Sequence, residues 1–187
     1  MTAPGPALPA PRTEGRYAVA LVCLGNICRS PMADVVLTSR VAEAGLADRI
    51  TVASSGTGDW HVGRPMDHRA AATLTAAGYD PSRHRAQQFA ATWLDEFDLV
   101  LAMDAANLAD VVSTSSTTEG HGPTTEGHGS TTEGHGRVRL FRDFDPDEPG
   151  GEVPDPYYGG HAGFEEVLAM VERTAATIVA QLRTQLG

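Results

Sequence analysis

The chain has 187 residues, a formal net charge of −10 and only two cysteines. This length allows one domain whose core needs no disulfides, and the acidic balance argues against a nucleic-acid surface or an anionic membrane as a partner. No stretch approaches the ~20 apolar residues of a membrane helix, and two cysteines in one short loop do not form a disulfide framework, so we expect a reducing, cytoplasmic setting.

Residues 1–16 form a lead-in before the first apolar run. They lack the basic start and apolar core of a secretory signal, and their four prolines predict disordered or extended chain with no function of its own. We therefore expect a single domain over residues 17–187, with an insertion at 113–136.

The stretch 17–32, YAVALVCLGNICRSPM, organises the chain. An apolar run typical of a buried strand ends on Cys23, a short loop follows, and Ser30 and Pro31 suit the cap and first position of a helix. A loop of this kind directs backbone N–H groups and the positive end of a helix dipole at one spot. The pattern predicts an anion site that fits a phosphate.

Two side chains make this anion site a candidate reaction site. Cys23 lies where the amides favour a thiolate nucleophile, and Arg29 can hold two phosphate oxygens with its planar guanidinium. The alternative without a function is that Cys23 is an inert buried thiol and Arg29 a surface cation. Cys28, the other thiol, could capture an oxidised Cys23 as a disulfide.

Strand and helix patterns alternate along the rest of the chain. We expect strands at 50–53, 99–103 and 138–141, and helices at 31–44, 67–78, 93–97, 105–112 and 163–186, with Asp67 and Thr92 as caps and Gly45 as a stop. This order predicts a three-layer α/β fold with a four-stranded parallel sheet covered by helices on both faces. In such folds ligands bind beyond the carboxyl ends of the strands, where Cys23 and Asp104 stand.

A repeat interrupts the pattern before the last strand. The motif TTEGHG occurs three times over residues 117–136, at a period of seven and with no apolar residue, which predicts a flexible loop. His121, His128 and His135 invite a metal reading, but their spacing resembles no structural zinc site, so we favour a linker.

The nonapeptide CLGNICRSP at 23–31, together with DPYYG at 155–159, resembles the low-molecular-weight protein tyrosine phosphatases. The resemblance implies hydrolysis of protein phosphotyrosine through a phosphocysteine, without metal or other cofactor, in a bacterial type of signalling. A departing tyrosine needs a proton donor, and Asp155, held between two prolines, is the candidate general acid and later general base. The loop residues expected to bind phosphate are Leu24, Gly25, Asn26, Ile27, Cys28 and Ser30.

Other positions receive roles through the same resemblance. Trp60, Tyr157 and Tyr158 are expected to form the walls of a slot for the aromatic substrate, although large aromatics often serve packing alone. Asn26 should adopt a left-handed conformation, held by Ser54 and His84, and Ser30 should donate its hydroxyl to the thiolate. The expected assembly is a monomer or weak dimer.

Three further identities stay open. Arsenate reductases share the fold but need more cysteines, and protein arginine phosphatases typically have threonine where Ile27 stands and lack the paired tyrosines. A silent phosphotyrosine-binding module is the third. Gln87 also departs from the arginine that many family members have after H-x-A, without an expected effect on the chemistry.

Overall fold

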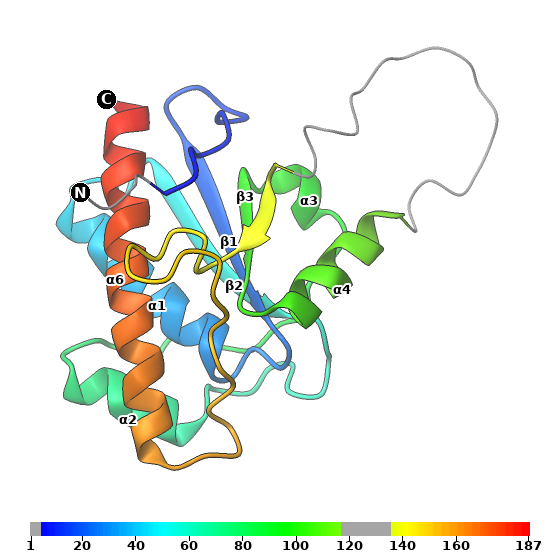
Figure 1. Cartoon of the computed structure of the whole chain (residues 1–187), viewed down its shortest axis with the longest axis vertical. Coiled ribbons are helices and arrows are strands. Elements are labelled where there is room, and N and C mark those ends of the chain that lie inside the picture. The colour runs from blue at the N-terminus through cyan, green and yellow to red at the C-terminus, as the bar shows by residue number, and fades with distance from the viewer. Residues whose placement is uncertain (1–4, 117–135) are drawn as a thin grey trace.

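The computed structural model describes residues 5–116 and 136–187, which form a three-layer α/β domain (Figure 1). Its sheet has four strands, β1 (Tyr17–Cys23), β2 (Ile50–Gly56), β3 (Leu99–Ala102) and β4 (Val138–Leu140). All pairings are parallel, and the order is β2-β1-β3-β4. The predicted fold is confirmed, and the chain reverses its winding direction between β1 and β3.

The strand β1 is apolar throughout because both of its faces are covered. Val19 and Leu21 are fully buried in the core beneath one helical layer, while Ala20 and Val22 are fully buried in a smaller core on the opposite face. This alternation explains why the sequence shows a continuous apolar run instead of a polar–apolar pattern.

The helices divide between the two faces, as Figure 1 shows. One face carries α1 (Arg29–Glu43), α2 (His68–Ala76) and α6 (His161–Leu186). The other carries α3 (Trp93–Glu96) and α4 (Ala105–Ser116). The C-terminal helix α6 packs along α1 and α2, so the last segment of the chain closes the larger core.

Two of the predicted helix ends are correct, one is wrong, and one is correct in position only. The Asp67 carboxylate accepts a hydrogen bond from the Arg69 amide at 2.8 Å and caps α2, and Gly45 ends α1 with a φ of 73°. In contrast, the first helical residue of α1 is Arg29, so Ser30 lies inside the helix and Cys28 occupies the cap position. Thr92 occupies the predicted cap position of α3, but its side chain makes no capping bond.

Residues 5–16, for which the sequence left disordered and extended chain open, run along the domain. The carbonyl of Pro9 accepts hydrogen bonds from Tyr17 and from Gln185 of α6, and the Arg12 amide donates to Asp98 at 2.6 Å. The TTEGHG repeats and their histidines lie outside the described residues, except for the final glycine. None of the helices in the described ranges has the length and apolarity needed to cross a membrane.

Candidate active site

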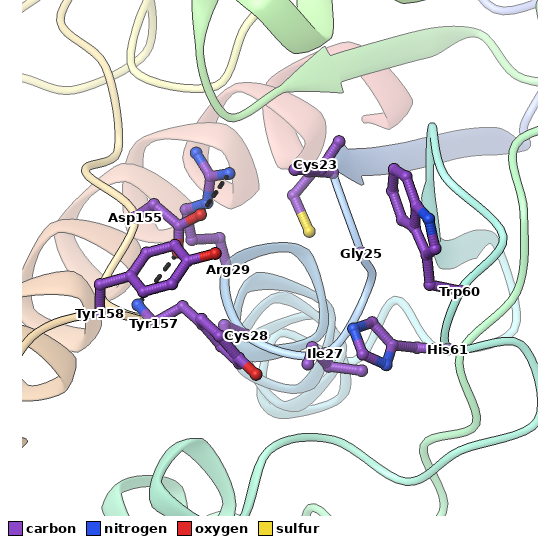
Figure 2. Close-up of a pocket in the computed structure, with 11 residues that line it drawn as sticks. Cys23, Gly25, Ile27, Cys28, Arg29, Trp60, His61, Asp155, Tyr157 and Tyr158 are labelled. Atoms are coloured by element: carbon purple, nitrogen blue, oxygen red, sulfur yellow. Dashed lines mark hydrogen bonds and ion pairs between the residues drawn. The ribbon is translucent and has the colours of Figure 1, made fainter.

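The carboxyl ends of β1, β2 and β3 meet at one edge of the sheet, where a cavity of about 320 Å³ opens. Cys23 ends β1 and pairs with Gly56 at the end of β2. The loop from β1 to α1 forms the floor of the cavity, and the Cys23 sulfur faces into it although the residue is only 3% exposed (Figure 2). The site expected from the strand ends is therefore a real cavity.

The floor loop is held by its one left-handed residue, Asn26, whose φ is 54°. The Asn26 amide nitrogen donates to the Ser30 hydroxyl at 2.9 Å, and its amide oxygen accepts from the Gln87 backbone at 3.0 Å. Nε2 of His84 lies 2.8 Å from the Asn26 carbonyl and donates to it, since a carbonyl only accepts. Gly56 lets the loop approach β2, because a Cβ there would lie 2.7 Å from the Leu24 carbonyl oxygen.

The Cys23 sulfur has two hydrogen-bonding neighbours in this loop. The Ser30 hydroxyl oxygen lies 2.9 Å from Sγ, and the backbone N–H of Asn26 donates to Sγ at 3.3 Å. Donors of this kind stabilise a sulfur anion, and the start of α1 adds the positive end of its dipole.

Arg29, the first residue of α1, is 3% exposed and has three partners. One terminal nitrogen donates to Asp104 at 2.5 Å and to the Val153 carbonyl at 3.2 Å, while the other lies 3.4 Å from Asp155. Burial alone would lower the pKa of Arg29, but the Cys23 sulfur, the bond to Asp104 and the charge of Asp155 raise it above its ordinary value. Arg29 is therefore a fixed cation beside the sulfur.

Asp104 orients this cation and caps the next helix. Its second carboxylate oxygen accepts from the Asn107 backbone at 2.7 Å, at the start of α4. Asp104 thus contacts Arg29 through one carboxylate oxygen and caps α4 through the other.

The loop that carries Asp155 comes just before α6 and lies across the cavity from Trp60. The Asp155 carboxylate accepts from the Tyr157 amide at 3.1 Å, and its side chain is 39% exposed, so it is anchored yet reachable by a ligand. Figure 2 shows Asp155 beside Arg29, with both on the cavity lining.

The predicted aromatic walls face one another across the cavity, with Trp60 on one side and Tyr157 and Tyr158 on the other (Figure 2). The Trp60 ring packs directly over Gly58, since a Cβ there would lie 1.7 Å from a ring carbon. The Tyr157 and Tyr158 rings meet edge to face, with centroids 5.0 Å apart. Aromatic walls of this kind suit a planar aromatic ligand.

Arg69 supports the tyrosine wall from α2, a role that no motif or spacing in the sequence indicates. Its guanidinium lies 5.5 Å from the Tyr157 ring centroid, donates to the Gly159 carbonyl at 3.4 Å and pairs with Asp67. The Asp67 amide in turn donates to the Ile27 carbonyl of the floor loop at 2.8 Å. Arg69 thus connects the floor loop to the loop that carries Asp155.

Several expectations need correction. Ser54 does not hold Asn26, because its hydroxyl donates instead to the half-buried Asp34 carboxylate at 2.8 Å. The serine that does contact Asn26 is Ser30. Gln87 contributes more than expected, since its backbone bonds Asn26 and its side-chain amide donates to the Ser54 carbonyl at 2.9 Å. Burial is the largest influence on Asp34 and raises its pKa.

The expected phosphate-binding set also divides in two. Leu24, Gly25, Ile27 and Cys28 line the cavity, while Asn26 and Ser30 are fully buried and brace the loop from below. His61 lines the cavity as well and was missed, because a histidine in a Gly-rich loop carries no sequence signal for such a place.

Burial raises the pKa of Cys28 to about 12, which keeps it a neutral thiol at pH 7. Within the described residues, no group of three or more His, Cys, Asp or Glu is arranged to hold a metal ion.

Comparison with known proteins connects this site to a family. Residues 18–186 match the family model for low molecular weight phosphotyrosine protein phosphatase. The chain is 42% identical over 172 residues to the low molecular weight protein-tyrosine-phosphatase of Streptomyces coelicolor, covering 91% of this chain and 96% of that protein. It is 41% identical over 156 residues to low molecular weight protein-tyrosine phosphatase A of Mycobacterium bovis, covering 82% and 84%.

A solved structure gives the same relation in three dimensions. The crystal structure of YfkJ from Bacillus subtilis superposes with a TM-score of 0.77 at 30% sequence identity, covering 92% of this chain and 98% of that chain. Because the family model spans nearly the whole described fold and the relatives match most of their own length, this chain belongs to the low-molecular-weight phosphotyrosine protein phosphatase family.

Proposed function

We propose that this protein hydrolyses phosphotyrosine in proteins through a phosphocysteine on Cys23, with Asp155 as general acid and base and no metal in the reaction. The observation that carries the proposal is the convergence of three groups on one cavity. A sulfur with two hydrogen-bonding neighbours, a buried cation and an accessible carboxyl all line it, beneath aromatic walls.

In the first step the Cys23 sulfur attacks phosphorus, and the bond between phosphorus and the tyrosine oxygen breaks. Arg29 and the loop amides stabilise the charge on the remaining phosphoryl oxygens. The leaving phenolate has a conjugate acid with a pKa near ~10, so a proton from the Asp155 carboxyl lowers the barrier to its departure.

In the second step water attacks the phosphocysteine. Asp155, now a carboxylate, takes a proton from the water while the bond between sulfur and phosphorus breaks. The Ser30 hydroxyl, 2.9 Å from the sulfur, stabilises the thiolate that leaves. Inorganic phosphate departs, and the starting state of the enzyme returns.

The walls support tyrosine as the substrate side chain. Trp60 and the paired tyrosines offer ring faces to an aromatic ester, which a phosphoserine lacks. Ile27 and the paired tyrosines favour this reading over an arginine phosphatase, and the absence of cysteines beyond Cys28 disfavours an arsenate reductase. The two free thiols are consistent with the proposed cytoplasmic setting.

Two variants test the chemistry with p-nitrophenyl phosphate at mildly acidic pH. We expect Cys23→Ser to abolish turnover, and Asp155→Asn to lower kcat by about 10²–10⁴-fold while inorganic phosphate still binds nearly as tightly. Activity that persists in Cys23→Ser, or that a chelator removes, would overturn the mechanism. Equal losses of kcat and phosphate affinity in Asp155→Asn would make Asp155 a structural residue.

A further inference from the structure

A second hollow of about 480 Å³ adjoins the reaction cavity. It lies between the loop that follows β2 and the outer surface of α4, and its lining includes Leu24, Trp60, Gln88, Phe89, Asp110 and Thr114. We call it the α4 groove. Leu24 and Trp60 line both hollows, so these two side chains form the partition between the reaction cavity and the α4 groove.

The partition is formed by two exposed apolar side chains. Leu24 is 43% exposed and Trp60 is 68% exposed, values that leave large apolar surfaces open to a ligand. The Trp60 ring rests on Gly58, which also lines the groove, so its orientation is set by the groove floor. A polypeptide whose aromatic side chain enters the cavity can continue across this rim.

The groove carries one sign of charge. Among its lining residues Asp110 is the only charged one, and its exposed carboxylate has no Lys, Arg or His within ion-pair distance in the described part of the chain. Gln88 and Thr114 add neutral polar groups, and Phe89 adds an aromatic surface. This combination suits the aliphatic stem and cationic head of an arginine or lysine side chain.

The reach from the reaction cavity is short. Asp104, which contacts Arg29, precedes α4, and Asp110 lies six residues later, or about 9 Å along the helix axis. An extended peptide rises about 3.3 Å per residue, so a side chain about two to four residues from the phosphotyrosine can reach Asp110.

From these observations we propose that the α4 groove is a specificity subsite, in which Asp110 binds a basic side chain flanking the phosphotyrosine of a protein substrate. The proposal rests on the proposed function, since it concerns the substrate of that reaction. It assigns recognition of the flanking sequence to α4, beyond the aromatic walls that recognise the tyrosine itself.

The experiment compares phosphotyrosyl peptides that differ at one flanking position. Arginine, alanine or glutamate is placed at each position within about four residues of the phosphotyrosine, on either side. Values of kcat/KM are measured for the wild type, Asp110→Asn and Asp110→Lys. Asp48→Asn is the matched control, because Asp48 is also exposed and changes the net charge equally but precedes β2, at the opposite edge of the sheet.

At low salt the wild type should prefer arginine over glutamate by about two- to five-fold at one or more positions, which is the size expected of an exposed ion pair. The preference should vanish in Asp110→Asn, reverse in Asp110→Lys and persist in Asp48→Asn. It should also shrink between about 0.1 M and 1 M salt, as the Debye length falls from about 10 Å to 3 Å.

Turnover of p-nitrophenyl phosphate, which has no flanking residues, separates the two proposals. If all variants hydrolyse it equally but the wild type shows no charge preference, or Asp110→Asn keeps the preference, the subsite is refuted and the proposed function stands. If the wild type turns over neither p-nitrophenyl phosphate nor any phosphotyrosyl peptide, the proposed function fails and the subsite fails with it.

Discussion

Asn26 offers the sharpest test of how the floor loop between β1 and α1 is held, because its backbone and its side chain contribute separately. Its φ of 54° lies in the left-handed region, and its side chain makes two hydrogen bonds while the residue is fully buried. Asn26→Gly keeps the backbone conformation accessible and removes the bonds. Asn26→Ala removes the same bonds and also disfavours the backbone conformation.

The structure sets the magnitudes. Two lost hydrogen bonds cost about 1 kcal/mol each, and the flexibility that glycine adds to the unfolded chain costs about 0.4–1 kcal/mol, so Asn26→Gly should lower the free energy of unfolding by about 2–3 kcal/mol. Alanine avoids the flexibility cost but incurs about 1–2 kcal/mol for a left-handed backbone. We therefore expect Asn26→Ala to be about 1 kcal/mol less stable than Asn26→Gly.

Urea unfolding followed by tryptophan fluorescence measures these differences, provided that the m value is unchanged. Gly45→Ala is the matched control, since Gly45 has a φ of 73° and a Cβ there would contact nothing within 4 Å, so it reports the left-handed cost alone. If Asn26→Gly is as stable as the wild type, the side-chain bonds do not hold the loop. If Asn26→Ala is no less stable than Asn26→Gly, the left-handed backbone is not what favours asparagine here.

Two further predictions concern the tyrosine wall and acid stability. Arg69→Met should raise KM for p-nitrophenyl phosphate by about two- to five-fold with a smaller change in kcat, because Tyr157 loses a cation–π contact. The control Arg64→Met, at an exposed position, should change neither constant. A loss confined to kcat would contradict this role of Arg69. Although burial would raise the pKa of Asp145, its bonds from Arg173 and Arg142 lower it to about 2, so its contribution is present above the unfolded value of about 3.9 and is lost as pH falls through about 2. Urea unfolding should therefore show that the difference in free energy of unfolding between the wild type and Asp145→Asn falls by about 2 kcal/mol from about pH 5 to pH 2. A difference that does not change with pH would contradict the assignment.

The sequence was sufficient for the chemistry that lies within one stretch of chain. Cys23, Arg29 and Ser30 belong to a strand, loop and helix that follow one another directly, so their spacing alone brings Arg29 and Ser30 beside the Cys23 sulfur. The left-handed Asn26 could be predicted for the same reason, because backbone conformation is a local property. Apolar runs and turn residues likewise located every strand of the described sheet to within a few residues.

Local sequence patterns did not predict which residues hold the site in place. Ser54 was expected to hold Asn26, but α1 places Asp34 beside the Ser54 hydroxyl, which donates to it instead. Ser30, four residues after Asn26, holds the Asn26 side chain. The start of α1 was misplaced because the floor loop turns directly into the helix at Arg29, so Ser30 contacts the sulfur instead of capping the helix.

The remaining contacts join segments that are far apart along the chain. Arg29 meets Asp155 across 126 positions, and Arg69 of α2 meets the Tyr157 wall just before α6. Such pairs leave no periodic signal, because hydrophobic patterning states which face of an element is buried but not which other element covers it. The sequence by itself therefore indicated the proposed nucleophile, the cation beside it and the parallel sheet. Only the tertiary structure decided that Ser54 bonds Asp34 instead of the loop, which arginine supports the tyrosine wall and where the α4 groove opens, because each depends on how separate elements pack together.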